Sequence, residues 1–486
     1  MAKLQAKDCN PLKKIVKKEE RPLDKDEEQT LKTLSKYFLE SNPDFNDWDD
    51  QIVSLRTTRC LDNPSEWQTL WWAGRYIGHA IINKTEISIL PRFGGDFLLT
   101  IIEDVYNIRF FYNDAKTQGE YPEAWFSNLL NVLRYKLWVS KCAVANRYGL
   151  PHTNVKREHQ GVTLKGRIDI HRTLLPWALK KEAVSNTTEK VLDDSICKIV
   201  YEAYRILSKG VQQNKPIKKK NAKDKLSYFS ASDTPAAAQD AINALNNNYK
   251  GTLVDMSESD YKRIRYKSIY VTWKPLVDFS WSIIKGKKIG MKESDTQSEC
   301  VFVDMAEIWE AFLRKKLSEG MSDEGWRVWT VDECKREVYK ESFFKRHIIP
   351  DIVLHRISKT DGKDEFLVFD AKYKRMSVKK GAENGEGNKY DVDRSDFFQI
   401  HTYMHYFQHV YPDSRVLLGG LLYPLDEKFE DFKVNNLFGE NGSFNTKFIV
   451  DGIVCTNLKT DENQKTKDEM QARVQEMITR IKSQIN

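Results

Sequence analysis

Two apolar segments in the second half of the chain carry acidic residues at positions where a strand begins or ends. They read PDIVL at 350–354 and FLVFDAKYK at 366–374. Side chains alternate between the two faces of a strand, so Asp370 and Lys372 are expected to share one face. If the two segments pair as neighbouring strands, Asp351 is brought to the same place. The spacing therefore predicts a site made of two carboxylates and one lysine.

Such a site has the parts needed to hydrolyse a phosphodiester. The reaction needs a nucleophilic water and stabilisation of negative charge on the phosphate, and Mg2+ provides both when carboxylate oxygens hold it. Asp351 and Asp370 are the expected metal ligands, with Mn2+ as a substitute ion. Lys372 is expected to orient the attacking water and to offset developing charge. Lys374 lies on the same face of the strand and is expected to contact DNA.

A third carboxylate is expected from the segment 301–313, which reads as an amphipathic helix. Its apolar residues recur at spacings of three and four and form one stripe. Glu310 lies on the flank of that stripe, where it can reach a sheet beneath the helix. We expect it to complete the set of catalytic and metal-binding carboxylates. Glu307, one helical turn earlier, is the alternative.

The segment 396–407 predicts another helix. Gln399 and Tyr403 are four residues apart on one face of it, where they are expected to contact DNA or the waters around the site. Each motif alone is common, because Asp-x-Lys occurs at many strand edges and a glutamate on a helix is usually only solvated. The ordered set, from a helix through two strands to a second helix, favours a nuclease over these simpler interpretations.

This ordered set resembles the McrC family, the nuclease subunits of McrBC and LlaJI-type restriction systems, within the PD-(D/E)xK nuclease superfamily. The family's Met-x-x-Leu-Phe-Glu helix corresponds to residues 305–310, its Pro-Asp to 350–351, and its Asp-Ala-Lys-Tyr-Lys to 370–374. Its Gln-x-x-x-Tyr helix corresponds to Gln399 and Tyr403.

Upstream segments extend the resemblance to roughly residues 70–425. The segments 75–78 and 87–92 are similar to the N-terminal strand pair of the family. The segment 164–169 is similar to its Arg-Gly-Arg-Ile-Asp motif, with Lys165 in place of the first arginine.

The resemblance implies a subunit that cuts double-stranded DNA with Mg2+ and binds no nucleotide itself. It implies docking through the N-terminal region onto a McrB-like AAA+ GTPase or other NTPase oligomer, whose hydrolysis the subunit stimulates. The sequence contains no Gly-x-x-x-x-Gly-Lys-Ser/Thr motif for binding phosphate. Two alternatives stay open: a stand-alone nuclease of the RecB type for repair or recombination, and a non-cleaving activator of a partner NTPase.

The expected fold is α/β, or α+β over the whole chain. A β-rich and helical partner-docking region precedes a restriction-endonuclease-like core, in which helices flank a central mixed sheet. The expected parts are a charged N-terminal extension (1–50), a β-hairpin and helical docking domain (51–175), a helical middle region (176–294) with a basic loop (211–235), the nuclease core (295–425), and a C-terminal extension and helix (426–486).

The N-terminal parts carry two further expectations. Residues 1–28 are rich in charge and indicate a solvated lead-in or a mobile tail. The β-rich segment 76–90 predicts a hairpin, which is either a plain surface hairpin or a projecting finger that enters a partner ring. In the second case Asn83, Lys84 or Arg75 is expected near the partner's nucleotide.

Composition sets the limits of these interpretations. The 486 residues suit two to three domains, and a net charge of +7 gives a mild preference for polyanionic partners such as DNA. Seven cysteines occur without a Cys-x-x-Cys spacing, so neither a disulfide framework nor a zinc site is expected. Since no apolar run reaches the length of a membrane span, we expect a cytoplasmic protein.

Overall fold

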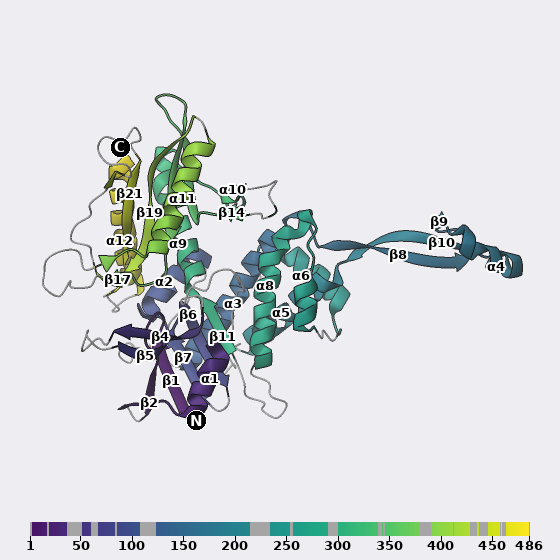
Figure 1. Ribbon diagram of the computed structural model, residues 1–486, viewed down its shortest axis with the longest axis horizontal. Coiled ribbons are helices and arrows are strands. Elements are labelled where there is room, and N and C mark those ends of the chain that lie inside the picture. Colours follow the sequence, from purple (N-terminus) through teal and green to yellow (C-terminus); the bar gives the residue numbers. More distant parts are fainter. Residues whose placement is uncertain are drawn as a thin grey trace.

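The computed structural model describes residues 2–16, 19–35, 51–59, 67–82, 85–106, 123–213, 234–252, 256–289, 300–338, 343, 346–378, 390–411, 413–427, 435–436, 446–456, 458 and 463–485. Figure 1 shows an N-terminal and a C-terminal sheet along one side of the molecule, a group of helices beside them, and a long arm pointing away from that group. Within these ranges no helix is long and apolar enough to cross a membrane. The mixed α/β architecture agrees with the prediction.

The N-terminal sheet consists of β1 (Ala2–Lys7), β2 (Lys13–Val16), β3 (Glu19–Arg21), β6 (Tyr76–Ile82), β7 (Thr85–Leu90) and β11 (Cys300–Asp304). Their order is β11-β6-β7-β1-β2-β3, and only β1 and β7 pair in parallel. Leu4 and Ala6 of β1 are buried against Ile87 and Ile89. The expected solvated or mobile lead-in at 1–28 is therefore wrong, because apolar side chains at alternate positions place this charged segment inside a sheet.

The predicted hairpin forms as β6 and β7, but it does not project from the molecule. β6 pairs with β11 on one side and with β7 on the other. Ile77 and Ala80 are fully buried. A Cβ atom on Gly78 would lie 2.2 Å from the carbonyl oxygen of Val301, so this position needs glycine for the close approach of β11. The expectation of a projecting finger here is wrong, because β6 is apolar on both of its faces.

Arg75 precedes β6 and is paired with an acid at the end of β11. Its Nε donates to both carboxylate oxygens of Asp304 at 3.0 Å, and its Nη2 lies 2.9 Å from Asp304 Oδ2. This paired guanidinium gives no support to the expected role of Arg75 near a partner's nucleotide. Asn83 and Lys84, the other two residues expected there, lie outside the described residues.

A group of helices packs beside the N-terminal sheet. It contains α2 (Gly95–Tyr106), α3 (Glu123–Ala145), α5 (Asp194–Gln213), α6 (Ala236–Tyr249), α7 (Glu258–Arg263) and α8 (Lys274–Ile289). Trp138 of α3 is fully buried and donates its indole N–H to Ser280 Oγ of α8 at 3.0 Å. The helices expected in this part of the chain are thus present. The basic loop expected at 211–235 lies mostly outside the described residues.

The arm leaves the helical group as a two-stranded ribbon. It is formed by β8 (His152–Gly161) and β10 (Ala183–Leu192), which pair from His152 with Leu192 at the base to Gly161 with Ala183 near the tip. The short strand β9 (Arg167–Ile168) and helix α4 (Ile170–Lys180) form the tip. Asp169 caps α4 by accepting the backbone N–H of Arg172. The projecting element is therefore this arm and not the β6–β7 hairpin (Figure 1).

The C-terminal sheet is mixed. Its strands are β12 (Arg327–Val328), β15 (Ile352–Ile357), β16 (Asp364–Ala371), β19 (Arg415–Leu425), β21 (Lys447–Val454) and β20 (Asn435–Asn436), in that order. β15 and β16 are antiparallel, whereas β16, β19 and β21 run parallel. Val353 and Val368 pack toward α11 (Arg394–Val410), while Leu354 and Leu367 pack toward α9 (Met305–Met321) and α12 (Asn463–Ile485). The expected central mixed sheet flanked by helices is found.

β11 and α9 join the two sheets without a loop between them. The sequence predicted helix from residue 301, but 300–304 forms a strand and the helix begins at Met305. The strand residues are Cys300-Val-Phe-Val, whose β-branched and aromatic side chains favour a sheet. Asp304 ends the strand and caps α9 by accepting the N–H of Ala306 at 2.8 Å. A strand of the N-terminal sheet thus leads directly into a helix that covers the C-terminal sheet.

Short elements complete the described chain. They are α1 (Lys25–Ser35), β4 (Val53–Arg59), β5 (Trp67–Ala73), η2 (Asn146–Tyr148), η4 (Ser268–Trp273), η5 (Ser322–Glu324), α10 (Val331–Cys334), β13 (Arg336–Val338), β14 (Arg346–Ile348), β17 (Ser377–Val378) and β18 (Tyr390–Asp391).

Candidate active site

The two strands predicted to carry carboxylates are neighbours in the C-terminal sheet. β15 pairs with β16 so that Ile352 lies opposite Phe369. Asp351 therefore stands beside the end of β16, where its Oδ2 accepts the backbone N–H of Ala371 at 2.8 Å. The register brings Asp351 and Asp370 together, as the residue order of the two segments predicted.

Lys372 forms the centre of the polar contacts at this end of β16. Its Nζ lies 2.6 Å from Oδ2 of Asp370, a side chain that is only 1% exposed. The same ammonium donates to Gln399 Oε1 at 2.8 Å and lies 3.4 Å from Asp396 Oδ1. Asp370 and Lys372 thus share the face of the strand that α11 covers, as predicted from strand alternation.

α11 holds the lysines through side chains of its first three turns. Gln399 donates its amide N–H to the Tyr403 hydroxyl at 2.9 Å, so the two residues share a face as expected. The Nζ of Lys374 lies 2.9 Å from Asp396 Oδ2 and 3.3 Å from Asp393 Oδ2. Lys374 is thus held by carboxylates at the start of α11. The sequence predicted a contact with DNA for this residue but not these ion pairs.

Asp396 is a site residue that sequence reasoning missed. It is 4% exposed, and its two oxygens face Lys372 and Lys374. The Tyr423 hydroxyl donates to its Oδ2 at 3.3 Å. Acids are common in the first turn of a helix because they interact favourably with the helix dipole. From the sequence alone, Asp396 therefore gave no sign that it also contacts the two lysines.

The charge of Asp370 acts on Glu310, whereas Glu307 is paired with a lysine of another helix. Glu307 lies 2.8 Å from the Lys141 ammonium of α3. Burial raises the pKa of the Glu310 carboxyl to about 7; Arg314 opposes this rise, and the charges of Glu307 and Asp370 add to it. The sequence predicted Glu310 rather than Glu307 as the third carboxylate of the site, and the charge of Asp370 acting on Glu310 is consistent with that prediction.

Crowding of negative charge marks the other two carboxylates as well. Burial raises the pKa of Asp351 well above its usual range, and the charges of Asp370 and Glu310 raise it further. Burial also raises the pKa of Asp370, although Lys372 opposes this. For Lys372, burial lowers the pKa, but Asp370 and Asp396 outweigh burial, and the net shift is upward. The site therefore contains three acids in a field of negative charge, beside a lysine that stays protonated.

Arg314 is a second residue that sequence reasoning missed. It lies on α9, one turn after Glu310, and its guanidinium donates to the backbone carbonyls of Asp351 and Trp329. These bonds fix the turn that precedes β15 to the helix that carries Glu310. No pattern in the sequence pairs an arginine with carbonyl groups that follow it by 15 and 37 residues.

The donor set fits a hard divalent cation by its chemistry. Burial and the charges of neighbouring carboxylates raise the pKa of three acids, Glu310, Asp351 and Asp370, and a cation between them relieves this repulsion. Asp370 Oδ2 accepts no well-aligned hydrogen bond within the described residues, although the Lys372 ammonium is close. In the described part of the chain no three such side chains are already arranged around a metal position. Binding would therefore require some of these carboxylate side chains to change position.

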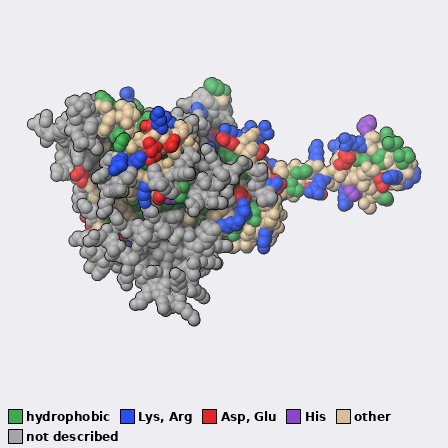
Figure 2. Space-filling model, turned by 90° about the horizontal axis from the view of Figure 1, so that it is seen from below, with side chains coloured by type: hydrophobic (Ala, Val, Ile, Leu, Met, Phe, Trp, Pro, Cys, Tyr) green, Lys and Arg blue, Asp and Glu red, His purple; other side chains and the backbone are tan. Residues whose placement is uncertain are grey.

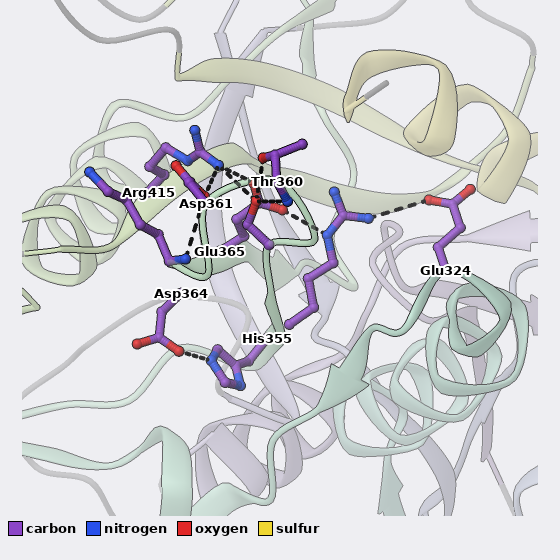
Figure 3. Close-up of polar contacts among 10 residues, drawn as sticks. Glu324, His355, Thr360, Asp361, Asp364, Glu365 and Arg415 are labelled. Atoms are coloured by element: carbon purple, nitrogen blue, oxygen red, sulfur yellow. Dashed lines mark hydrogen bonds and ion pairs between the residues drawn. The ribbon is translucent and has the colours of Figure 1, made fainter.

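A separate polar cluster lies at the opposite end of the same strands (Figure 3). Glu365, 5% exposed, accepts Arg356 Nε at 2.7 Å and Arg415 Nη2 at 2.6 Å. His355, which follows Asp351 on the same strand face, is bound to Asp364 at 2.6 Å. Since its acids are matched by cations, this cluster fixes β15, β16 and β19 to one another and does not form part of the candidate site.

Comparisons with known proteins cover most of the chain. The family model described as McrBC 5-methylcytosine restriction system component matches residues 72–424. No curated protein sequence matches the chain.

Two solved structures from Thermococcus gammatolerans match the chain at low identity. One is a refined half-complex from a tetradecameric assembly of McrB AAA+ hexamers with bound McrC; it is 14% identical, covers 92% of each chain and has a TM-score of 0.33. The other is the cryo-EM structure of the McrBC complex of that organism; it is 12% identical, covers 60% of this chain and 78% of that chain, and has a TM-score of 0.29.

Proposed function

The chain belongs to the McrBC 5-methylcytosine restriction system component family, and from this premise we propose that it is the DNA endonuclease subunit of such a system. It hydrolyses phosphodiesters of double-stranded DNA, works with Mg2+, and is activated by an AAA+ GTPase or NTPase whose hydrolysis it stimulates. The observation that carries the proposal is that Asp351, Asp370 and Lys372 meet where β15 begins and β16 ends, close enough to α9 for Asp351 and Asp370 to share electrostatic repulsion with Glu310.

Each residue of the site has a role that follows from its contacts. Glu310, Asp351 and Asp370 would hold Mg2+, which when bound supplies a nucleophilic water and neutralises charge on the phosphate. Lys372 keeps its proton beside Asp370 and Asp396, so it acts as a positive charge that orients a water or a phosphate oxygen.

Two contacts keep these side chains in place before substrate binds. The Ala371 N–H holds Asp351, and Gln399 holds the Lys372 ammonium from the side of α11. Such preorganisation lowers the cost of orienting the groups when the reaction takes place.

The arm provides the surface that we assign to the AAA+ partner. Helix α4 at its tip has no buried residue. Its exposed apolar side chains are Ile170 (69%), Leu174 (67%), Leu175 (69%), Trp177 (50%) and Leu179 (74%). Figure 2 shows hydrophobic side chains beside lysine and arginine side chains at the end of the arm. Apolar side chains gathered on a projecting element indicate a protein-binding surface.

The test is to purify the chain with the product of a neighbouring gene that encodes an AAA+ protein. DNA with and without cytosine methylation is then incubated with the complex, Mg2+, and either GTP or ATP. We expect nucleotide-dependent cleavage, which Asp370→Asn lowers by roughly 10²–10³-fold while partner binding is retained. Cleavage by the chain alone without nucleotide would instead indicate a stand-alone nuclease, and full biological activity of Asp370→Asn would indicate a non-cleaving activator.

A further inference from the structure

Arg92 is a buried arginine that the proposed chemistry does not use. It follows β7 in the N-terminal sheet and is 8% exposed. Its guanidinium lies over two aromatic rings, 4.6 Å from the centroid of Phe93 and 4.7 Å from that of Tyr373. Tyr373 directly follows Lys372 on the strand of the candidate site. The arginine therefore connects the N-terminal sheet to the strand that carries Asp370 and Lys372.

Arg92 is buried without forming an ordinary salt bridge. None of its three guanidinium nitrogens donates a hydrogen bond within the described residues. The carboxylate of Asp8, 0% exposed, accepts the backbone N–H of Arg92 and attracts the guanidinium from a distance. Burying a cation without hydrogen bonds is costly, and stacking on two rings recovers only part of the cost. If this side chain only filled space in the core, an apolar residue would stabilise the fold at least as well.

The backbone of the same strand is held by the segment beside Asp8. The Cys9 thiol donates to the carbonyl oxygen of Tyr373 at 3.7 Å. Cys9 has a φ of 53°, in the left-handed region that residues other than glycine rarely adopt, and its N–H donates to the carbonyl of Gly74 at 2.9 Å. A strained backbone thus places the thiol against the strand. Arg92 holds the ring of Tyr373, and Cys9 holds its carbonyl.

Tyr373 lies on the opposite face of the strand from the site. It is 3% exposed, and its ring centroid lies 6.5 Å from that of Trp309, which is the residue before Glu310. A strand is stiff over two residues, so a shift of the ring on one face moves Asp370 and Lys372 on the other. Tyr373 thus connects α9 with the end of β16, two of the three elements that position the catalytic carboxylates.

We propose that Arg92 is a positioning residue, which holds Tyr373 and thereby sets Lys372 and Asp370 in the geometry that cleaves DNA. Through it, the position of the N-terminal sheet controls the active strand. The inference rests on the proposed endonuclease function, because it assigns a regulatory contact to that same site. It predicts that loss of the guanidinium loosens the strand without removing any residue that touches DNA or metal.

The experiment compares the full chain, alone and with its AAA+ partner, as wild type, Arg92→Met, Arg92→Lys and Arg134→Met. Arg134 is the matched control, a buried arginine of α3 at 5% exposure that lies in another part of the molecule. Two properties are measured. The first is alkylation of Cys9 in the chain alone, located by mass spectrometry. The second is single-turnover cleavage of saturating DNA by the complex, with the rate constant and the amplitude recorded separately.

Arg92→Met is expected to expose Cys9 to alkylation at least tenfold faster and to lower the cleavage rate constant by roughly 10²-fold, with DNA affinity unchanged. Arg92→Lys, which keeps the charge but not the planar stack, is expected to fall between the wild type and Arg92→Met. Arg134→Met is expected to leave Cys9 protected; if it unfolds part of the sample, it lowers the amplitude of cleavage and not the rate constant.

The outcomes distinguish the inference from the function on which it rests. If the wild-type complex does not cut DNA but Arg92→Met exposes Cys9, the contact stands and the endonuclease proposal falls. If Arg92→Met keeps Cys9 protected, or lowers only the amplitude of cleavage as Arg134→Met does, Arg92 has no positioning role. If Arg92→Met fails to fold, Arg92→Lys decides by the same two measurements.

Discussion

At the scale of single residues, the candidate site depends on how the charge of Lys372 is balanced. Asp370 and Gln399 are its nearest partners, and the buried Asp396 adds a second carboxylate from the first turn of α11. Lys372 and Lys374 both contact Asp396, so this one side chain sets the spacing of two ammonium groups over the site.

Replacing Asp396 with asparagine tests this role. We expect Asp396→Asn to lower the single-turnover rate of DNA cleavage roughly tenfold, because the two lysines lose a shared counter-charge and shift from their positions. Asp391→Asn changes an exposed carboxylate in the segment that precedes α11 and serves as the control. An unchanged rate for Asp396→Asn would show that Asp370 and Gln399 alone are sufficient to place Lys372.

Glu310 gives the site a dependence of stability on pH when no metal is bound. Its pKa is about 7 in the folded protein, against 4.5 for a free glutamate, so the folded state binds more protons between these values. The stabilisation that follows is fully present below about pH 4.5 and is lost as the pH rises through 7. We expect the wild type to lose roughly 1–3 kcal/mol relative to Glu310→Gln over this range.

Urea unfolding in EDTA between pH 4 and pH 8 measures this difference. Parallel stability curves for the wild type and Glu310→Gln would contradict it. At pH 8, addition of Mg2+ is expected to raise the melting temperature of the wild type more than that of Glu310→Gln, because a ligand that binds only the folded state stabilises it.

At the scale of elements, the cluster around Glu365 fixes the register of three strands. Glu365 on β16 contacts Arg356 on β15 and Arg415 on β19, and Arg356 lies 3.9 Å from Glu324. We expect Glu365→Gln to lower the free energy of unfolding by about 2 kcal/mol, since the buried Glu365 loses its charged hydrogen bonds to two partly exposed guanidinium groups. Glu324→Gln, at a longer and more exposed contact, is the control and should cost less than about 1 kcal/mol.

Denaturant unfolding followed by circular dichroism measures both variants. The cluster lies at the other end of β16 from Asp370, so the cleavage rate per folded molecule is expected to be unchanged in Glu365→Gln. Equal stability losses in the two variants would show that Glu365 has no special role in the register.

The elements also show which parts of the structure could be predicted from the sequence. The two central strands and α11 follow from local periodicity, and so does the shared face of Asp370 and Lys372. β1 was missed, because its charged sequence forms a strand only through its pairing with β7, about 80 residues later. The roles of Arg314 and Asp396 depend on how α9 and α11 lie against the sheet, and local patterns do not contain that information.

At the scale of the whole molecule, the arm separates the surface assigned to the partner from the site assigned to DNA. Few side chains of the ribbon between its base and its tip are buried, so the arm contributes little to the core of the helical group. Its removal is therefore expected to affect binding to the partner and not the folding of the rest of the chain.

The variant that tests this replaces residues 153–191 with an Asn-Gly turn between His152 and Leu192, which pair at the base of the ribbon. We expect an unchanged melting temperature and loss of co-purification with the AAA+ partner. A chain with the full arm but with Leu174→Asp and Trp177→Asp should show the same loss if the apolar tip makes the contact. Wild-type affinity of the chain without the arm would place the docking surface elsewhere.

The continuity of β11 with α9 has a consequence for how such proteins can evolve. Residues 300–304 form an edge strand of the N-terminal sheet. Asp304 also caps the helix that carries Glu310, and its carboxylate is bound by Arg75. A recombination event that exchanged the nuclease half between two relatives would have to keep an acid at position 304, or the ion pair with Arg75 would be lost. The arm begins and ends at the paired residues His152 and Leu192, and the described residues beyond this base can be lengthened, shortened or replaced without touching either sheet. Inheritance is thus expected to keep the two sheets together as one unit while the arm diverges with its partner.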